Sequence, residues 1–245
     1  MSKMSRRDLI KGMGAVGMLA MAGPLVNLSS CAVSPSGTSS PENTASTGNP
    51  STDCVLTPEE TEGPYYIQSS QVRQDISEGR PGQALRLVLT VLNANTCQPI
   101  PDAMVDIWHA DAEGVYSAYP GQSDSRSLDT TGKTFLRGVQ VTGSNGQASF
   151  TSIYPGWYRG RTTHIHFKIH FNNSTRVTSQ LYFPETVSTA VYTAHSAYKA
   201  RGDKDTPNGR DMIFVQTSGS GRLLLKVEKQ GDSYVASNTI GIAVA

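Results

Sequence analysis

The chain has 245 residues, and its 21 Lys and Arg against 20 Asp and Glu leave a net charge of +1. A charge near zero without a basic stripe argues against nucleic acid as a partner. No internal repeat is visible, and nothing beyond the N-terminal region has the composition of a membrane segment.

The N-terminal region predicts an export signal. Basic residues that include Arg6 and Arg7 precede an apolar run rich in Gly and Ala over 12–26, which is typical of a twin-arginine signal peptide. This run is too short and too rich in glycine for a membrane span. Residues 28–31 resemble a bacterial lipobox, so we expect residues 1–31 to act as signal and lipobox, with Cys31 lipidated. The alternative is an ordinary cleaved signal with a chance cysteine. The lipobox predicts an exported lipoprotein, anchored by its lipid at the periplasmic or outer cell surface.

The next segment predicts a flexible tether. Residues 32–52 consist mainly of Ser, Thr, Pro, Gly and Asn, which bury too little apolar surface to offset their ordering entropy. Assigning Cys31 to the lipid leaves two cysteines, and an exported protein can keep a disulfide. We therefore predict a Cys54–Cys97 disulfide near the start of the domain that spans 53–245.

Residues 53–245 predict one all-β domain, because about 190 residues suffice for a substantial core. Alternating apolar residues between turn signals predict strands at 84–92, 103–108, 135–142, 148–153, 163–171, 177–183, 211–216, 222–229 and 234–242. Only 186–198 has a helical pattern. The predicted fold class is therefore a β-sandwich of antiparallel strands with one short helical segment.

The segment 158–167 has the most informative chemistry. His164 and His166 are two residues apart in an alternating run, so in a strand both imidazoles lie on one face. Two imidazoles on one face form a chelate for a transition metal. Alone, such a pair is more often surface or core histidine. Three nearby residues strengthen the metal interpretation. Tyr158 precedes the histidines, Arg161 lies between Tyr158 and His164, and Tyr116 occupies a similar turn earlier in the chain.

Two phenol oxygens and two imidazole nitrogens form an unusual set of metal ligands. A free phenol has a pKa of about 10 and becomes a good ligand only when a strongly acidic cation lowers that value. Fe(III) is such a cation, whereas zinc sites use Cys, His and carboxylates. The alternative for Tyr116 and Tyr158 is an anchoring role in their loops, with each ring on the core.

Several segments resemble the intradiol ring-cleavage dioxygenases of the protocatechuate dioxygenase type. They include TPEETEGPYY at 57–66, PDAMVDIWHAD at 101–111, GVY at 114–116, LRG at 136–138, PGWY at 155–158 and RTTHIHF at 161–167. They follow the order of the family from about residue 56 to the last strand. The resemblance implies a β-sandwich with a non-haem Fe(III) centre. It also implies cleavage of catechols by O2 between the hydroxylated carbons, giving muconate-type diacids.

The resemblance implies roles for particular residues. It makes four residues iron ligands: Tyr116, Tyr158, His164 and His166. Tyr158 matches the tyrosinate that leaves iron when substrate binds, and Arg161 matches the arginine that stabilises negative charge on the substrate ring. Gln180 matches a polar residue of the substrate pocket, and we also expect Tyr65 and Trp157 at the pocket wall.

One departure from the family bears on the substrate. Only two residues separate Tyr158 from Arg161, fewer than in better-known members. The short spacing predicts a more open pocket mouth. We therefore expect the substrate to be larger than catechol, or the enzyme to select less strictly among catechols, and we expect it to meet them at the cell surface. The expected partners are a catechol and O2, and the oligomeric state stays open, with a homodimer as one expectation.

Two other interpretations compete with the enzyme. A non-catalytic exported β-sandwich that binds sugar, peptide or protein would have the same fold, but it leaves the joint presence of the tyrosines, histidines and Arg161 unexplained. A periplasmic iron or copper binder, or a catechol-siderophore receptor, would keep the metal but would not consume catechol with O2.

Overall fold

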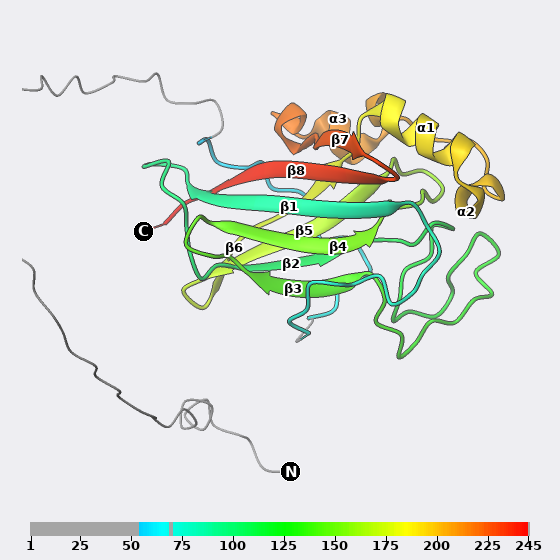
Figure 1. The fold of residues 1–245 in the computed structure, drawn as a ribbon, viewed down its shortest axis with the longest axis horizontal. Coiled ribbons are helices and arrows are strands. Elements are labelled where there is room, and N and C mark those ends of the chain that lie inside the picture. The colour runs from blue at the N-terminus through cyan, green and yellow to red at the C-terminus, as the bar shows by residue number, and fades with distance from the viewer. Residues whose placement is uncertain (1–53, 69–70, 245) are drawn as a thin grey trace, which may run out of the picture. The chain divides into compact units, whose positions relative to one another are not determined.

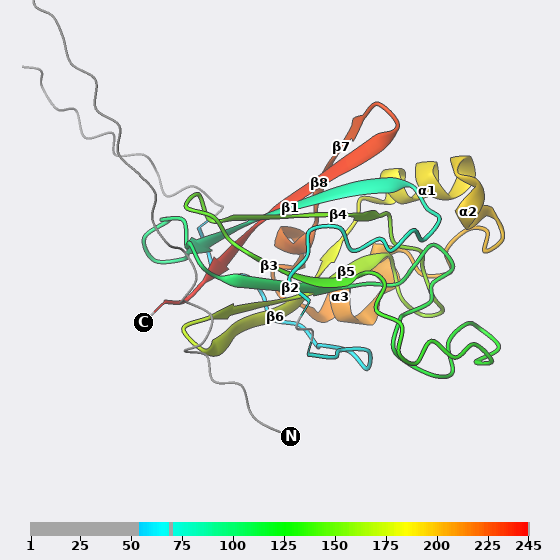
Figure 2. The same cartoon turned by 60° about the horizontal axis from the view of Figure 1, so that its bottom comes forward.

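The computed structural model describes residues 54–68 and 71–244. This part of the chain forms two four-stranded sheets that pack face to face, as the two views in Figures 1 and 2 show. The predicted β-sandwich is confirmed. The predicted signal peptide, Cys31 and the tether lie outside the described residues.

The first sheet has the strand order β4 (Gln147–Ile153), β1 (Ala84–Asn93), β8 (Ser233–Ile242), β7 (Lys226–Gln230). β1 is antiparallel to β4 and parallel to β8. Every second residue of β1 is buried against the other sheet, as its alternating sequence predicts: Leu85, Leu87, Leu89 and Val91.

The second sheet has the order β3 (Arg137–Val141), β2 (Met104–Trp108), β5 (His164–Phe171), β6 (Ser174–Tyr182), and all its pairs are antiparallel. β5 is an inner strand between β2 and β6. The register places His166 between Trp108 on β2 and Gln180 on β6. One row of the sheet therefore brings together three chain segments at the beginning of β5.

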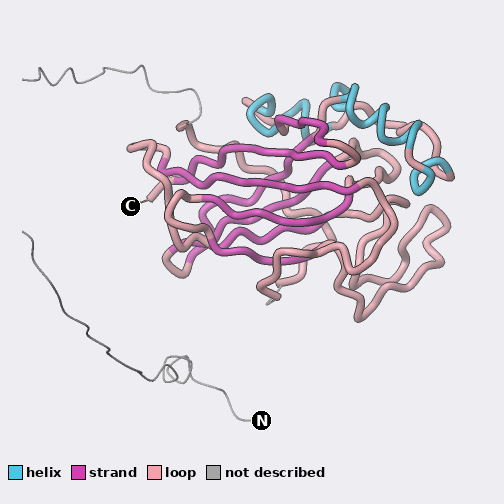
Figure 3. Tube along the Cα trace, in the orientation of Figure 1, coloured by secondary structure: helices cyan, strands magenta, loops and turns pink. Residues whose placement is uncertain are grey.

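The helices are α1 (Glu185–Ala194), α2 (Ser196–Lys199) and α3 (Met212–Gln216), with 3-10 turns at Asn208–Arg210 and Ser220–Leu223. They gather along one side and one end of the sandwich (Figure 3). Within residues 54–68 and 71–244, none of the helices is long and apolar enough to cross a membrane.

One predicted strand is wrong. Residues 211–216 form α3, so the described chain has a second helical region beyond the single one expected. The Asp211 carboxylate accepts hydrogen bonds from the backbone N–H groups of Ile213 at 3.0 Å and Phe214 at 3.2 Å, which caps the helix. A short apolar run does not distinguish a strand from a helix by its periodicity.

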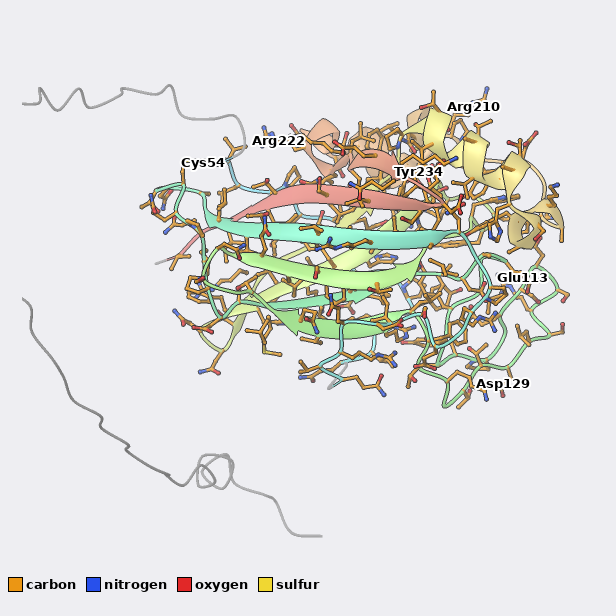
Figure 4. The ribbon with its side chains drawn as sticks, viewed as in Figure 1. Cys54, Glu113, Asp129, Arg210, Arg222 and Tyr234 are labelled. Atoms are coloured by element: carbon orange, nitrogen blue, oxygen red, sulfur yellow. A yellow bond between two sulfur atoms is a disulfide. The ribbon has the colours of Figure 1, made fainter. Side chains whose placement is uncertain are left out.

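Residues 54–68 form an N-terminal strap that runs from the end of β8 across β6. A disulfide joins Cys54 to Cys97, with their Cα atoms 5.1 Å apart, and Figure 4 shows Cys54 at the edge of the sandwich. Further along, the N–H of Glu60 donates to the Thr178 carbonyl at 2.9 Å, and the Ser179 hydroxyl donates to the Pro58 carbonyl at 2.7 Å. The strap therefore follows sheet two towards the beginning of β5.

Candidate metal centre

Two loops meet at the end of sheet two where β5 begins. The loop between β2 and β3 carries Tyr116, and the loop between β4 and β5 carries Tyr158. Their backbones touch at Gly114, where φ is +77° and an added Cβ would lie 2.2 Å from the Trp157 carbonyl oxygen. Only glycine allows this approach. It brings the two tyrosine-bearing turns to the same end of the sheet.

The four side chains predicted as ligands converge on one point. The Nε2 atom of His164 lies 3.2 Å from Nε2 of His166, 3.2 Å from the Tyr158 hydroxyl and 3.4 Å from the Tyr116 hydroxyl. Both histidines and Tyr116 are buried, and Tyr158 is partly exposed. Residues separated by 48 positions in the sequence thus present their polar atoms to a shared centre.

The tautomer of His164 follows from its backbone contact. Its Nδ1 atom lies 2.6 Å from the Thr162 carbonyl oxygen, which can only accept a hydrogen bond. This contact assigns the ring proton to Nδ1 and leaves a lone pair on Nε2. A metal-ligating histidine has this arrangement, in which a carbonyl holds the other ring nitrogen.

Packing orients His166. Its ring stacks on Trp108, with centroids 5.0 Å apart and planes 4° apart, and Gly63 of the strap lies against its edge. Its Nδ1 atom is buried and has no hydrogen-bond partner among the described residues. The orientation of this imidazole therefore depends on its neighbours on both sides.

Burial keeps all four groups neutral. It lowers the pKa of His164 and His166 well below the ordinary value, so both imidazoles keep a free lone pair. Burial also raises the pKa of Tyr158, and it raises that of Tyr116 well above the usual range. Both phenols therefore stay protonated until a strongly acidic cation ionises them.

The donor set fits a metal ion of that kind. Ligand atoms about 2 Å from a shared ion lie about 3 Å from one another, which agrees with the observed separations of 3.2–3.4 Å. No cluster of three or more His, Cys, Asp and Glu side chains elsewhere in the described ranges is arranged to hold a metal. The mixed phenol and imidazole cluster is the candidate centre.

Arg161 lies beside Tyr158 and is held at three atoms. Its Nη1 is 3.4 Å from the Tyr158 hydroxyl, its Nη2 donates to Oε1 of Gln180 at 2.5 Å, and its Nε donates to Asp211 at 2.8 Å. Burial alone lowers the pKa of Arg161, but its electrostatic interactions with Tyr158 and with the Asp211 carboxylate, to which it also donates a hydrogen bond, outweigh that effect and raise it. The guanidinium is therefore a permanent positive charge at the edge of the cluster.

Gln180 supports this arginine and is fully buried. Its amide nitrogen donates to the Thr61 carbonyl of the strap at 3.0 Å, and its oxygen accepts from Arg161. The amide orientation is thus determined from both ends. Gln180 acts on the site through Arg161.

A pocket of about 330 Å³ opens next to the cluster. Tyr65, predicted at the pocket wall, stacks on Tyr116 with ring centroids 4.5 Å apart and lines this pocket together with Tyr158. The remaining lining comes from the loop between β2 and β3 and from the start of the Tyr158 turn: Gly114, Gly121, Gln122, Ser123, Asp124, Arg126 and Arg159.

Trp157 does not line this pocket. Its ring packs in the core beneath Arg201, and its indole N–H donates to the Gly202 carbonyl at 3.2 Å. His109 also has a structural role, because Nδ1 contacts the Ala110 carbonyl and Nε2 the Ser152 hydroxyl, each at 2.8 Å. Burial lowers the pKa of His109 to about 4.

The sequence did not indicate three residues that support the site. Trp108 stacks on His166, Gly63 packs against the edge of the same ring, and Asp211 holds Arg161. Gly63 and Trp108 lie inside motifs that were recognised for other reasons. Asp211 lies 50 residues beyond Arg161, in a segment that the sequence suggested to be a strand, so no local signal pointed to it.

A family model described as Dioxygenase matches residues 61–201, a stretch that contains all four converging side chains, Arg161 and Gln180. The chain belongs to the intradiol ring-cleavage dioxygenase family. An intradiol ring-cleavage dioxygenase from Tetranychus urticae has a similar structure, with a TM-score of 0.71 and 33% sequence identity over 78% of this chain and 95% of that one.

Two further relatives extend the comparison. A dioxygenase domain from Streptomyces sp. SirexAA-E matches with a TM-score of 0.56 and 27% identity, covering 78% of this chain and 99% of that chain. Catechol 1,2-dioxygenase from Acinetobacter baylyi is 26% identical over 148 residues, which are 51% of this chain and 45% of the relative. The chain spans about half the length of the curated relatives it matches.

Proposed function

We propose that this intradiol dioxygenase domain uses Fe(III) and O2 to cleave catechol-type diols between their hydroxylated carbons, with muconate-type diacids as products. One observation carries the proposal. Two phenol oxygens lie 3.2 and 3.4 Å from the lone-pair Nε2 of His164, and the Nε2 of a second imidazole lies at 3.2 Å. Membership of the family supports the same reaction.

Four side chains would hold the iron: Tyr116, Tyr158, His164 and His166. Two phenolates and two neutral imidazoles suit a hard, highly charged ion. When bound, Fe(III) would withdraw electron density from a chelated catecholate and make its ring reactive towards O2. The buried, neutral state of the histidines keeps their lone pairs available for this ion.

Tyr158 is suited to move a proton. It is the more exposed of the two tyrosines and borders the pocket, whereas Tyr116 is covered by Tyr65. Its Oη, once ionised, can accept a proton from a catechol hydroxyl. Arg161 stands 3.4 Å from this oxygen and stabilises negative charge as it moves from Tyr158 to the substrate.

The pocket beside Tyr158 suits a small-molecule substrate such as a catechol, and the short spacing between Tyr158 and Arg161 favours a substituted one. Its volume of about 330 Å³ falls at the lower end of small-molecule sites, about 300–1,000 Å³. The twin-arginine and lipobox sequences support an exported, lipid-anchored protein that meets such compounds at the cell surface, and the Cys54–Cys97 disulfide is compatible with an oxidising compartment. A homodimer is part of the same proposal.

The test is O2 uptake by the iron-loaded protein with a panel of catechols, combined with product analysis. We expect consumption of equal amounts of catechol and O2, and a product with two carboxylates from carbon–carbon cleavage between the former hydroxyl carbons. Activity on several substituted catechols would support the open pocket. Tight catechol binding without O2 uptake would instead identify a receptor for catechols.

A further inference from the structure

Asp211 is fully buried, and both of its carboxylate oxygens are satisfied. Oδ2 accepts from Nε of Arg161 at 2.8 Å and from the backbone N–H of Thr162 at 2.9 Å. Oδ1 accepts from the N–H groups of Ile213 and Phe214 at the start of α3. This one side chain therefore links the first turn of α3 to the segment that leads into β5.

The contact with Arg161 has a directional effect. A guanidinium group is a rigid planar fork, so fixing Nε also fixes the directions of Nη1 and Nη2. Nε bonded to Asp211 leaves Nη1 facing the Tyr158 hydroxyl and Nη2 facing Gln180. Only 16% of the Arg161 side chain is exposed, and Asp211 is its one carboxylate partner among the described residues.

We propose that Asp211 is the positioning residue for Arg161, holding its Nε so that Nη1 points at the oxygen of Tyr158. This inference rests on the proposed function, in which Arg161 stabilises charge on the substrate. Asp211 acts through Arg161 and touches neither the substrate nor the cluster of phenols and imidazoles.

A purely structural role for Asp211, as the cap of α3, makes a different prediction. Asp211→Asn keeps a side-chain oxygen for the cap but removes the charge that attracts Nε. Val215→Gly weakens α3 at an exposed position and leaves the Asp211 carboxylate in place. If capping alone matters, Val215→Gly should harm activity at least as much as Asp211→Asn for an equal loss of melting temperature.

The geometry can be tested without turnover, on metal-free protein. Nitrogen-15 NMR of the arginine Nε–H groups should show one slowly exchanging, downfield Arg161 signal, identified by its loss in Arg161→Gln. We expect Asp211→Asn to shift this signal and speed its exchange, and Val215→Gly to leave it in place. An unchanged Arg161 signal in Asp211→Asn would overturn the proposal, whatever the outcome of the activity assay.

Steady-state kinetics of the iron-loaded variants then test whether the position of Arg161 affects catalysis. We expect Asp211→Asn to lower kcat about 10- to 100-fold with little change in KM, as losses of supporting groups typically do, while Val215→Gly keeps the wild-type kcat. In an Arg161→Gln background, Asp211→Asn should cost nothing further, because both changes remove the same function. Losses of kcat that add fully in the double variant would overturn the proposal. If the wild-type protein shows no turnover, the proposed function is refuted, and the NMR result alone then decides whether Asp211 positions Arg161.

Discussion

Gly63 lies so close to His166 that a Cβ added to it would stand 3.0 Å from Cε1 of the imidazole. Trp108 stacks on the same ring. His166 is therefore clamped between the N-terminal strap and sheet two, and its Nε2 points towards His164 because both neighbours are in place. The strap supplies none of the four candidate iron ligands, but it determines the position of one of them, His166.

Gly63→Ala should weaken metal binding. The change costs about 1 kcal/mol for a non-glycine residue at φ +72°, and it also pushes the His166 ring. Gly79→Ala is the matched control, because its φ is +70° but nothing lies within 4 Å of an added Cβ. We expect similar losses of melting temperature from φ alone, and a lower iron affinity only in Gly63→Ala. Equal iron affinities in the two variants would contradict the clamp.

Arg161→Gln should separate catalysis from metal binding. Removal of a positioned charge that stabilises an anionic transition state typically costs about 10²- to 10³-fold in kcat. Because Arg161 is not a donor of the cluster, iron content should stay at the wild-type level. Arg86→Gln, at an exposed position of β1, serves as the control and should leave kcat unchanged. Loss of iron in Arg161→Gln would show that the arginine is needed to assemble the centre.

Asp106 gives a prediction for pH dependence. Burial raises its pKa to about 7, and this effect outweighs the Tyr66 hydroxyl, which donates to it at 3.2 Å, and the charges of Lys168 and Arg137. The folded domain therefore keeps a proton that the unfolded chain releases near pH 4. The resulting stability is fully present below about pH 4 and is lost as the pH rises to 7.

Asp106→Asn should remove this pH dependence. Relative to the variant, the wild-type free energy of unfolding should fall by about 2 to 4 kcal/mol between pH 4 and pH 8. Urea unfolding of the metal-free wild type and variant at several pH values measures this difference in free energy of unfolding. Parallel stability profiles of the two proteins would show that Asp106 is ionised throughout.

Removal of the disulfide should loosen the strap. Cys54 and Cys97 are 43 positions apart, and the chain-entropy model gives about 4 kcal/mol for a closed loop of that length. The double variant Cys54→Ser with Cys97→Ser should melt at a lower temperature and bind iron more weakly, since the strap carries Gly63. An unchanged iron affinity after such a loss of stability would mean that the remaining strap contacts suffice to hold Gly63.

Local patterns predicted most of the fold and the histidine pair, whereas the family resemblance supplied the ligand roles of Tyr116 and Tyr158. Alternation located β1 and β5, and the His-x-His pair on one face followed from the period of a strand. Supporting contacts were not predictable in the same way. Asp211 reaches Arg161 only through the tertiary fold, and its own segment became a helix because the carboxylate caps it. Trp157 illustrates the reverse case, because we expected it at the pocket wall while its ring packs in the core.

The most direct test of the four-donor centre is the visible absorption spectrum of the purified protein, with iron analysis, before and after catechol is added in air. We expect one iron per chain and a tyrosinate-to-Fe(III) band that is altered in Tyr116→Phe and in Tyr158→Phe. Catechol should shift the band, which should then return as product forms. A colourless protein that cannot be reconstituted with iron, or a band unaffected by either tyrosine substitution, would contradict the account.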